Sequence, residues 1–442
     1  MKTRLNAPHI AAERSSSTDT ATFEAQTYAK VGRRLIPFLM LCYLGAYLDR
    51  VNVGFAKLQM LNDLRFSETV YGIGAGIFFL GYFLFEVPSN VILHKVGARN
   101  WLARIMLTWA VISASFVFVK SPTTFYVLRF LLGVAEAGFA PGVILYLTYW
   151  FPAARRAKAL SLFFMAIPLA GIVGGPLSGY IMHAFQGAHG LAGWKWLFML
   201  EALPSLVLGV VILFYLDNGI AGAKWLTDAE KALLTRNVEK DRSQTVEHVS
   251  IRAFIGDRRL WLMASIYFCV VLGQYGLTFW LPTIIRRAGV ADPLWVGIFT
   301  AIPYLCAIVA LPLIGASADK RRERRLHLAI PMLVAAAGFA TLPMLGSVGA
   351  SIICVSVAAA GILASSSQFW SLPTAVLGGM SAAAGIAAVN CFANLAGFFS
   401  PAIVGWLNDL TGKSTAGLIF ISTAIVVGAG LVFLVPAKTI NR

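Results

Sequence analysis

Residues 35–57 read LIPFLMLCYLGAYLDRVNVGFAK, an apolar segment in which an acid and a base stand side by side near the end. An α-helix rises about 1.5 Å per residue, so about 20 mostly apolar residues cross the hydrocarbon core of a bilayer. The segment is long enough to do so, which places Asp49 and Arg50 within the membrane. A charge at that depth is costly and usually faces a partner or a water-filled path. The stretch therefore predicts a membrane helix that carries a functional site.

Eleven further apolar runs of similar length follow the first. The twelve predicted spans cover residues 35–57, 70–93, 101–119, 124–148, 159–182, 195–216, 259–283, 294–316, 327–346, 350–372, 380–406 and 414–436. Only 13% of the residues are charged and the mean hydropathy is +0.75, which excludes an ordinary soluble domain. We predict an all-α membrane protein with twelve transmembrane helices.

The longest polar interruption divides the spans into two sets of six. The predicted parts are a disordered cytoplasmic tail (1–30), a six-helix bundle (31–216), a cytoplasmic linker (217–258), a second six-helix bundle (259–436) and a short tail (437–442). Within the linker, KWLTDAEKALLTRNVEKDR (224–242) predicts an amphipathic surface helix that is capped at Thr227 or Asp228.

The distribution of basic residues predicts the orientation. Of the 36 Lys and Arg residues, 26 fall in the tails and in the loops on their side, and seven fall in the loops on the opposite side. The positive-inside rule therefore predicts that both termini are cytoplasmic. The net charge of +16 is spread over short clusters between apolar runs, so we expect no nucleic-acid partner.

Two basic loops occupy matching positions in the two halves. GASADKRRERR (315–325) follows the eighth span and NVILHKVGARN (90–100) follows the second. In the former, Gly315, Asp319 and Lys320 resemble the loop signature of the major facilitator superfamily, in which such loops contribute to gating. The latter departs from the signature, because His94 stands where that superfamily usually has Asp. The resemblance implies the major facilitator fold, with two six-helix bundles around a central cavity.

Longer motifs resemble one branch of that superfamily, the anion:cation symporters. They are YLDRVNVGFA (47–56), GIFFLGYFLFEVPSN (76–90), LRFLLGVAEAGFAPGVILYLTYWFP (128–152), GGPLSG (174–179), WLFMLEALPS (196–205) and YGLTFWLP (275–282). That family includes bacterial permeases for tartrate, phthalate, hydroxyphenylacetate, nicotinate and sugar acids. The resemblance implies proton-coupled import of a small organic anion, without naming the anion. We expect a monomer in the bacterial inner membrane.

Two buried arginines are the candidates for binding a carboxylate. Helix rise places Arg50 in the outer half of the first span and Arg129 in the outer third of the fourth, at a similar depth. Both could then face one cavity and bind an anion through their planar guanidinium groups. The alternative is that each arginine bonds a helix carbonyl or an acid and only ties helices together.

Two acids are the candidates for proton coupling. Adjacent helical residues point about 100° apart, so Asp49 and Arg50 should have different partners. Glu136 follows Arg129 by seven residues and shares its helix face. The family resemblance assigns proton coupling to acids at the positions of Asp49 and Glu136. The alternatives are a structural ion pair for Asp49 and a hydrogen-bonded packing acid for Glu136. For Glu86 and Glu201 we favour structural roles.

Polar and aromatic residues within other spans could complete a substrate site. The candidates are Tyr47, Tyr82, Gln274, Ser367, Trp370, Asn390 and Asn394. An intramembrane amide or hydroxyl needs a partner, which can be a ligand or another helix. Each residue taken singly is more often a packing residue than a ligand contact.

Other function classes have weaker support. The five cysteines show no metal-ligand spacing, TGKST (411–415) lacks the first glycine of a phosphate-binding loop, and no nucleophile pairs with a base. We therefore predict no metal, no cofactor and no enzyme activity. GIVGGPLSG (171–179) fits a pattern of drug–proton antiporters, so an antiporter or exporter is the first alternative. A membrane sensor that transports nothing is the second.

Overall fold

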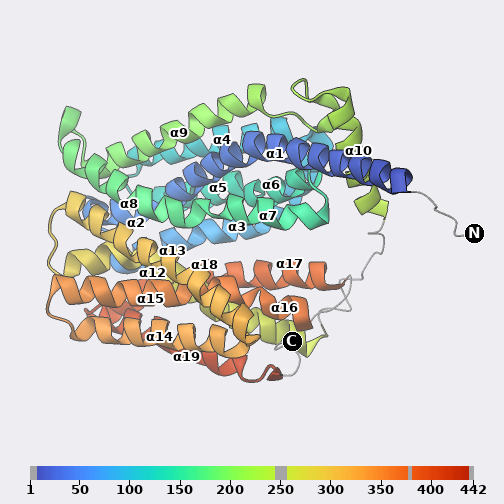
Figure 1. Cartoon of the computed structure of the whole chain (residues 1–442). Coiled ribbons are helices and arrows are strands. Elements are labelled where there is room, and N and C mark those ends of the chain that lie inside the picture. Colours follow the sequence, from blue (N-terminus) through green and yellow to red (C-terminus); the bar gives the residue numbers. More distant parts are fainter. Residues whose placement is uncertain (1–6, 244–255, 377–380, 438–442) are drawn as a thin grey trace, which may run out of the picture.

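The computed structural model describes residues 7–243, 256–376 and 381–437, and these parts form helices, short 3-10 turns and connecting loops. The helices gather into two groups, one above the other in Figure 1, with the first half of the chain in blue and green and the second in yellow to red. Parts of the predicted tails and linker (1–6, 244–255 and 438–442) lie outside the described residues.

The first bundle contains the helices of the amino-terminal half. They are α1 (Ala7–Val51), α2 (Val53–Leu64), α3 (Glu68–Val96), α4 (Ala98–Ala114), α5 (Pro122–Glu136), α6 (Phe139–Thr148), α7 (Ala153–Phe164), α8 (Ala166–Ala184) and α9 (Gly193–Tyr215). The linker forms α10 (Asp228–Ser243).

The second bundle contains the helices that follow the linker. They are α12 (Arg258–Arg287), α13 (Pro293–Arg321), α14 (Arg325–Thr341), α15 (Val348–Phe369), α16 (Ser371–Val376), α17 (Ser381–Asn394), α18 (Ala396–Thr411) and α19 (Thr415–Val432). A short 3-10 turn, η4 (Leu342–Met344), follows α14.

The prediction of twelve membrane spans is confirmed for the described residues. Several spans consist of two helices separated by a break, such as α1 and α2 around Asn52, or α5 and α6 around Ala137 and Gly138. Gly138 has φ +87°, and a side chain there would collide with Ser89 of α3. Glycine meets both requirements, and the break falls directly after Glu136.

The disordered tail is the prediction from which the structure departs. Helix α1 begins at Ala7, so residues 7–30 are helical. Side chains near the end of this segment pack on the rest of the bundle: Tyr28 and Val31 are buried, and the Tyr28 ring lies 5.9 Å from the Phe151 ring. This tertiary packing stabilises a segment whose polar composition alone indicated disorder.

The linker contains a helix, α10, and the start of this helix is a capping box. The Thr227 hydroxyl accepts a hydrogen bond from the backbone N–H of Glu230 (3.3 Å), and the Glu230 carboxylate accepts one from the N–H of Thr227 (2.8 Å). Glu230 also forms an ion pair with Lys30 of α1 at 2.7 Å. The linker helix is thereby attached to the first bundle.

The two bundles meet through small residues. The loops after the odd-numbered spans lie on one side of the molecule, the far side, and the linker lies on the other, the terminal side. Helix α3 packs on α18 and α8 packs on α13. A methyl group at Gly72 would overlap the carbonyl of Pro401, and one at Gly175 would overlap Gly297. Only glycines allow the backbones to approach this closely.

Candidate functional site

Arg50 and Glu136 form a buried ion pair between two helices of the first bundle. Arg50 lies in the last turn of α1 and Glu136 is the last residue of α5. The side chain of Arg50 donates from Nε to Glu136 Oε1 at 3.1 Å and also from Nη2 to the same oxygen. Arg50 is 7% exposed and Glu136 is 2% exposed. The cation therefore already has an anionic partner, and Glu136 has one oxygen in use.

Aromatic rings surround the guanidinium group of Arg50. It lies 5.7 Å from the ring of Tyr47, 5.2 Å from Phe78 and 5.4 Å from Tyr82. The second bundle contributes Tyr275, whose hydroxyl lies beside Arg50. Ring faces attract a cation, and phenol hydroxyls can donate to an anion. The ion pair thus lies where the two bundles meet.

Asp49 faces away from Arg50, toward two other helices. It accepts hydrogen bonds from Trp109 Nε1 (3.1 Å) and the Ser113 hydroxyl (2.7 Å) of α4, and from the Ser205 hydroxyl (2.7 Å) of α9. These three donors were not identified from the sequence. Their signal was weak: a Trp and a Ser four residues apart in one span, and a single Ser in another.

Arg129 is placed differently from the sequence expectation of a shared cavity. Its side chain is 0% exposed and donates to the carbonyls of Gly74 and Ala75 at 3.0 Å each. A third, longer contact joins it to the carbonyl of Arg50 at 3.5 Å. The small residues of α3 let the guanidinium reach the helix backbone, which occupies its donors. In this structure Arg129 ties α5 to α3 and α1.

The remaining candidates divide by position. Tyr47 and Tyr82 lie beside Arg50, as described above. Gln274, Trp370, Asn390 and Asn394 are half-buried and Ser367 is exposed. The structure shows Trp370 packed against Tyr267 at 4.7 Å between ring centroids. None of the described contacts brings these five residues to the Arg50–Glu136 pair.

The loop signature lies at the terminal-side end of α13. Its acid, Asp319, accepts a hydrogen bond from the guanidinium group of Arg324 at 2.5 Å. Gly315 faces Gln368 of α15, and Lys320 is exposed. The described contacts of this loop are therefore within the second bundle.

Glu201 is a buried acid without a basic partner among the described residues. It accepts a hydrogen bond from the Ser178 hydroxyl at 2.6 Å, which joins α9 to α8. Its other oxygen lies beside the amide of Asn52, without a hydrogen bond of standard geometry between them. The structural role of Glu201 stays a prediction.

Polar contacts between the bundles gather on the far side. Lys57, which is buried, forms an ion pair with Glu68 at 2.6 Å and lies 3.5 Å from the ring centroid of Trp280. Glu68 also pairs with Arg287 of the second bundle at 3.0 Å. Asp409 of α18 accepts hydrogen bonds from the backbone N–H groups of Glu68 and Thr69 at 3.1 and 2.7 Å.

These contacts close the far side. Asp409 acts as a helix cap supplied by the other bundle, because it satisfies N–H groups in the first turn of α3. This network was not predicted from the sequence, in which Lys57 and Arg287 are only basic residues near the ends of apolar runs. No spacing in the sequence links residues so far apart.

Comparison with known proteins defines the family. The profile of the Major Facilitator Superfamily matches residues 39–401. The chain belongs to the major facilitator superfamily. A bacterial homologue of the human lysosomal transporter Spinster, solved in an inward-facing and occupied conformation, has the same fold with a TM-score of 0.75. It is 16% identical, and the alignment covers 92% of this chain and 96% of that one.

Three relatives of this chain are named as transporters. A protein of Pseudomonas putida named as the metabolite transport protein NicT is 46% identical over 94% of this chain and 95% of its own length. A protein of Agrobacterium vitis named as a tartrate transporter is 47% identical over 96% and 95%. A quinolone resistance transporter of Acinetobacter baumannii is 40% identical over 94% and 96%. The superfamily member is thus a multi-pass membrane transporter and not an enzyme.

Proposed function

We propose that this transporter imports a small organic carboxylate together with protons across the bacterial inner membrane, as a monomer with both termini in the cytoplasm. The relatives named for tartrate and for metabolite transport support a small organic substrate. The observation that carries the proposal is the buried Arg50–Glu136 ion pair at the meeting point of the bundles.

The ion pair gives a direct route to coupling. A carboxylate substrate and Glu136 compete for one guanidinium group, because both are anions that the fork of Arg50 can bind. Protonation of Glu136 removes its charge and releases Arg50 to the substrate. Release of the proton on the other side of the membrane restores the charge of Glu136. The Arg50–Glu136 pair then forms again and displaces the anion. Transport of the anion is then linked to movement of a proton.

Asp49 supplies a second candidate proton site. It is buried, and its three described hydrogen-bond partners are neutral donors on α4 and α9. An acid inside a membrane protein without a cationic partner is a candidate for carrying a proton. Because α4 and α9 belong to the same bundle as α1, a change in the charge of Asp49 alters packing within that bundle. Alternating access by rocking of the two bundles would use this response.

The contacts of Glu68 with Arg287 and of Asp409 with α3 would stabilise a state of this cycle in which the far side is closed. Opening the far side requires separation of Arg287 from Glu68 and of Asp409 from α3. Arg129, in this proposal, supports the site by holding α3 and α5 together beside Arg50.

The test is uptake of labelled tartrate and of a panel of small carboxylates into proteoliposomes that contain the purified chain. We expect acidification of the outside to stimulate uptake of at least one of them, and Arg50→Gln to abolish it. The matched control is Arg104→Gln, which changes a membrane arginine beside Trp101 of α4. Uptake that is indifferent to a proton gradient would contradict symport.

A second candidate function is export in exchange for protons, which the 40% identical quinolone resistance transporter favours. The antiporter-like motif at 171–179 does not discriminate, because Gly175 and Gly179 pack directly on α13 and a symporter needs such packing equally. In the same vesicles, an exporter would expel a fluoroquinolone when the opposite compartment is acidified, and the symporter would not.

A further inference from the structure

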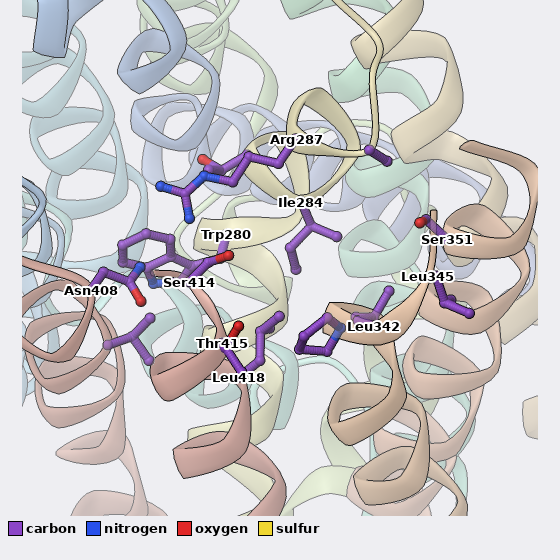
Figure 2. A pocket seen from close by; sticks show the side chains of 14 residues that line it. Trp280, Ile284, Arg287, Leu342, Leu345, Ser351, Asn408, Ser414, Thr415 and Leu418 are labelled. Carbon is purple, nitrogen blue, oxygen red and sulfur yellow. The ribbon is translucent and has the colours of Figure 1, made fainter. Parts of the chain in front are cut away.

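A small cavity lies at the far-side end of the second bundle, apart from the Arg50–Glu136 pair. Its volume is about 180 Å³, and its lining comes from α12, η4, α15, α18 and α19 with their flanking residues. Figure 2 shows Trp280 and Asn408 on one side of it and Leu342 and Leu345 on the other, with Arg287 and Ile284 between them. All of the lining residues belong to the second bundle.

Three lining residues carry buried polar atoms that lack a hydrogen-bond partner in the described part of the chain. They are Trp280 through Nε1, Thr283 through its hydroxyl, and Asn408 through both atoms of its amide. These residues are only 2%, 7% and 4% exposed. A buried polar group without a partner costs about 1–3 kcal/mol, and such groups are rare in native proteins. Four such atoms around one cavity indicate that something polar fills it.

The chemistry of the wall specifies the occupant. The Trp280 indole N–H can only donate, the Thr283 hydroxyl and the Asn408 amide nitrogen can donate, and Arg287 adds a positive charge. The Asn408 amide oxygen is the one acceptor among the four unpartnered atoms. Arg287 uses one nitrogen to bind Glu68, so its other N–H groups remain available to a ligand in the cavity. No acidic residue lines the cavity. Convergent donors with a cation and no carboxylate favour an anion.

The apolar part of the lining limits the anion further. It includes Ile284, Leu342, Leu345, Val404 and Leu418. A fully hydrated inorganic ion would leave these side chains against water, whereas a compact apolar group would bury them. The volume equals that of about six water molecules, which is too small for a drug-sized ligand.

We propose that this cavity is a second ligand site, which binds a small carboxylate with a compact apolar body from the far side. Its carboxylate lies among Trp280, Asn408 and Arg287, and its apolar body lies against Leu342 and Leu418. The site is separate from the transport pair and does not depend on the direction or coupling of transport.

The site is formed best when the far side is closed. Lys57 lies over the ring of Trp280, and Glu68 holds Arg287, so the first bundle fixes two of the donors. A ligand that needs both donors in place binds more tightly to this state than to one in which the bundles have separated there. Occupancy therefore favours the closed far side.

The test is the binding of 4-fluorobenzoate to the purified full chain in detergent. Binding is measured from the broadening of the ¹⁹F NMR signal of this probe. Arg50→Gln serves as the background, because it disables the candidate transport site. In this background we expect one equivalent of bound probe, and at least a tenfold loss of affinity in Thr283→Val/Asn408→Leu. These apolar replacements remove the hydrogen-bonding atoms without leaving new unpaired ones. Thr108→Val is the control, since that hydroxyl bonds the Arg104 carbonyl of its own helix in the first bundle.

A second variant, Trp280→Phe, controls for misfolding, because it removes only the indole N–H and part of the ring. It should lower the affinity for the probe and leave the melting temperature unchanged. Unchanged binding in both variants, or absence of probe binding in the Arg50→Gln background, would overturn the second site and leave the cavity to water. Displacement of the probe by equimolar inorganic phosphate would also overturn it, because the site would then select charge alone. If Arg50→Gln fails to disable the transport site, two equivalents bind and the cavity variants remove one. The two proposals are thus tested separately.

Discussion

Arg50 of α1 directs two of its nitrogens to a single oxygen of Glu136, the residue at which α5 ends. The pair is buried, so neither charge is compensated by bulk water. Removing one partner of a buried ion pair is costly because the other charge is left unpaired. A substrate carboxylate that replaces Glu136 avoids this cost only if Glu136 takes up a proton at the same time. In the proposed mechanism, this single geometry links proton binding to anion binding.

Replacement of Arg50 by Lys tests the need for a planar fork. Lysine keeps the charge but not the paired N–H groups, so we expect the KM for the carboxylate to rise at least tenfold, with the melting temperature changed little. Labelled uptake at several substrate concentrations measures this. An unchanged KM would mean that the substrate does not use the fork.

Arg129→Lys tests whether Arg129 connects the helices or binds the anion. A lysine ammonium lacks the guanidinium fork that bonds the carbonyls of Gly74 and Ala75 together, so at least one of them loses its partner. We expect a loss of stability of about 1–3 kcal/mol with the KM unchanged. Thermal unfolding and uptake kinetics provide the two readings. A raised KM with an unaltered melting temperature would instead restore the anion-binding role considered from the sequence.

Asp409→Ala tests the far-side closure. The first turn of α3 loses a cap supplied by the other bundle, which is worth about 0.5–2 kcal/mol. We expect faster hydrogen exchange at the amides of Glu68 and Thr69, measured by mass spectrometry. Asp257→Ala is the matched control, because Asp257 caps α12 within its own bundle. Equal exchange in the variant and the wild type would show that the cap does not hold the far side closed.

Acidic pH should release the linker helix from the first bundle. Burial alone would raise the pKa of Glu230, but hydrogen bonds from Lys30 and Thr227 outweigh it and hold that pKa below its ordinary value. A lowered pKa in the folded state means that the contact is stabilising above the ordinary value and is lost as the pH falls through the lowered one.

Hydrogen exchange of α10, corrected for the intrinsic effect of pH, measures this release. It should rise at acidic pH in the wild type, and Glu230→Gln should raise it already at neutral pH. Glu239→Gln, an exposed change on the same helix, is the control. A wild-type helix that stays protected below the range in which carboxylates titrate would contradict the role of Glu230.

The sequence was sufficient for the spans and for the burial of the candidate residues, but not for their pairing. Apolar runs of about 20 residues have one stable solution in a bilayer, so the twelve helices followed from length alone. Burial of Arg50, Glu136 and Asp49 followed from their positions in those runs. Which charge meets which donor depends on the packing of helices that are distant in the chain, and no local pattern specifies it.

Arg129 illustrates this limit. Its depth was estimated from helix rise, but its partners are backbone carbonyls of α3, which every residue possesses and which no residue type reveals. The same holds for the break after Glu136, which requires the positive φ of Gly138 and its contact with Ser89. Glycines are frequent in this chain, and only the packed structure distinguishes this one.

The central claim is that the substrate and Glu136 compete for Arg50. The most direct test is the affinity of the purified protein for its carboxylate, measured by calorimetry over a range of pH in the wild type and in Glu136→Gln. We predict that wild-type affinity rises as the pH falls. Glu136→Gln should bind tightly at every pH, because the amide carries no charge and leaves Arg50 available. If Glu136→Gln retains the pH dependence of the wild type, the ion pair does not couple the proton to the anion.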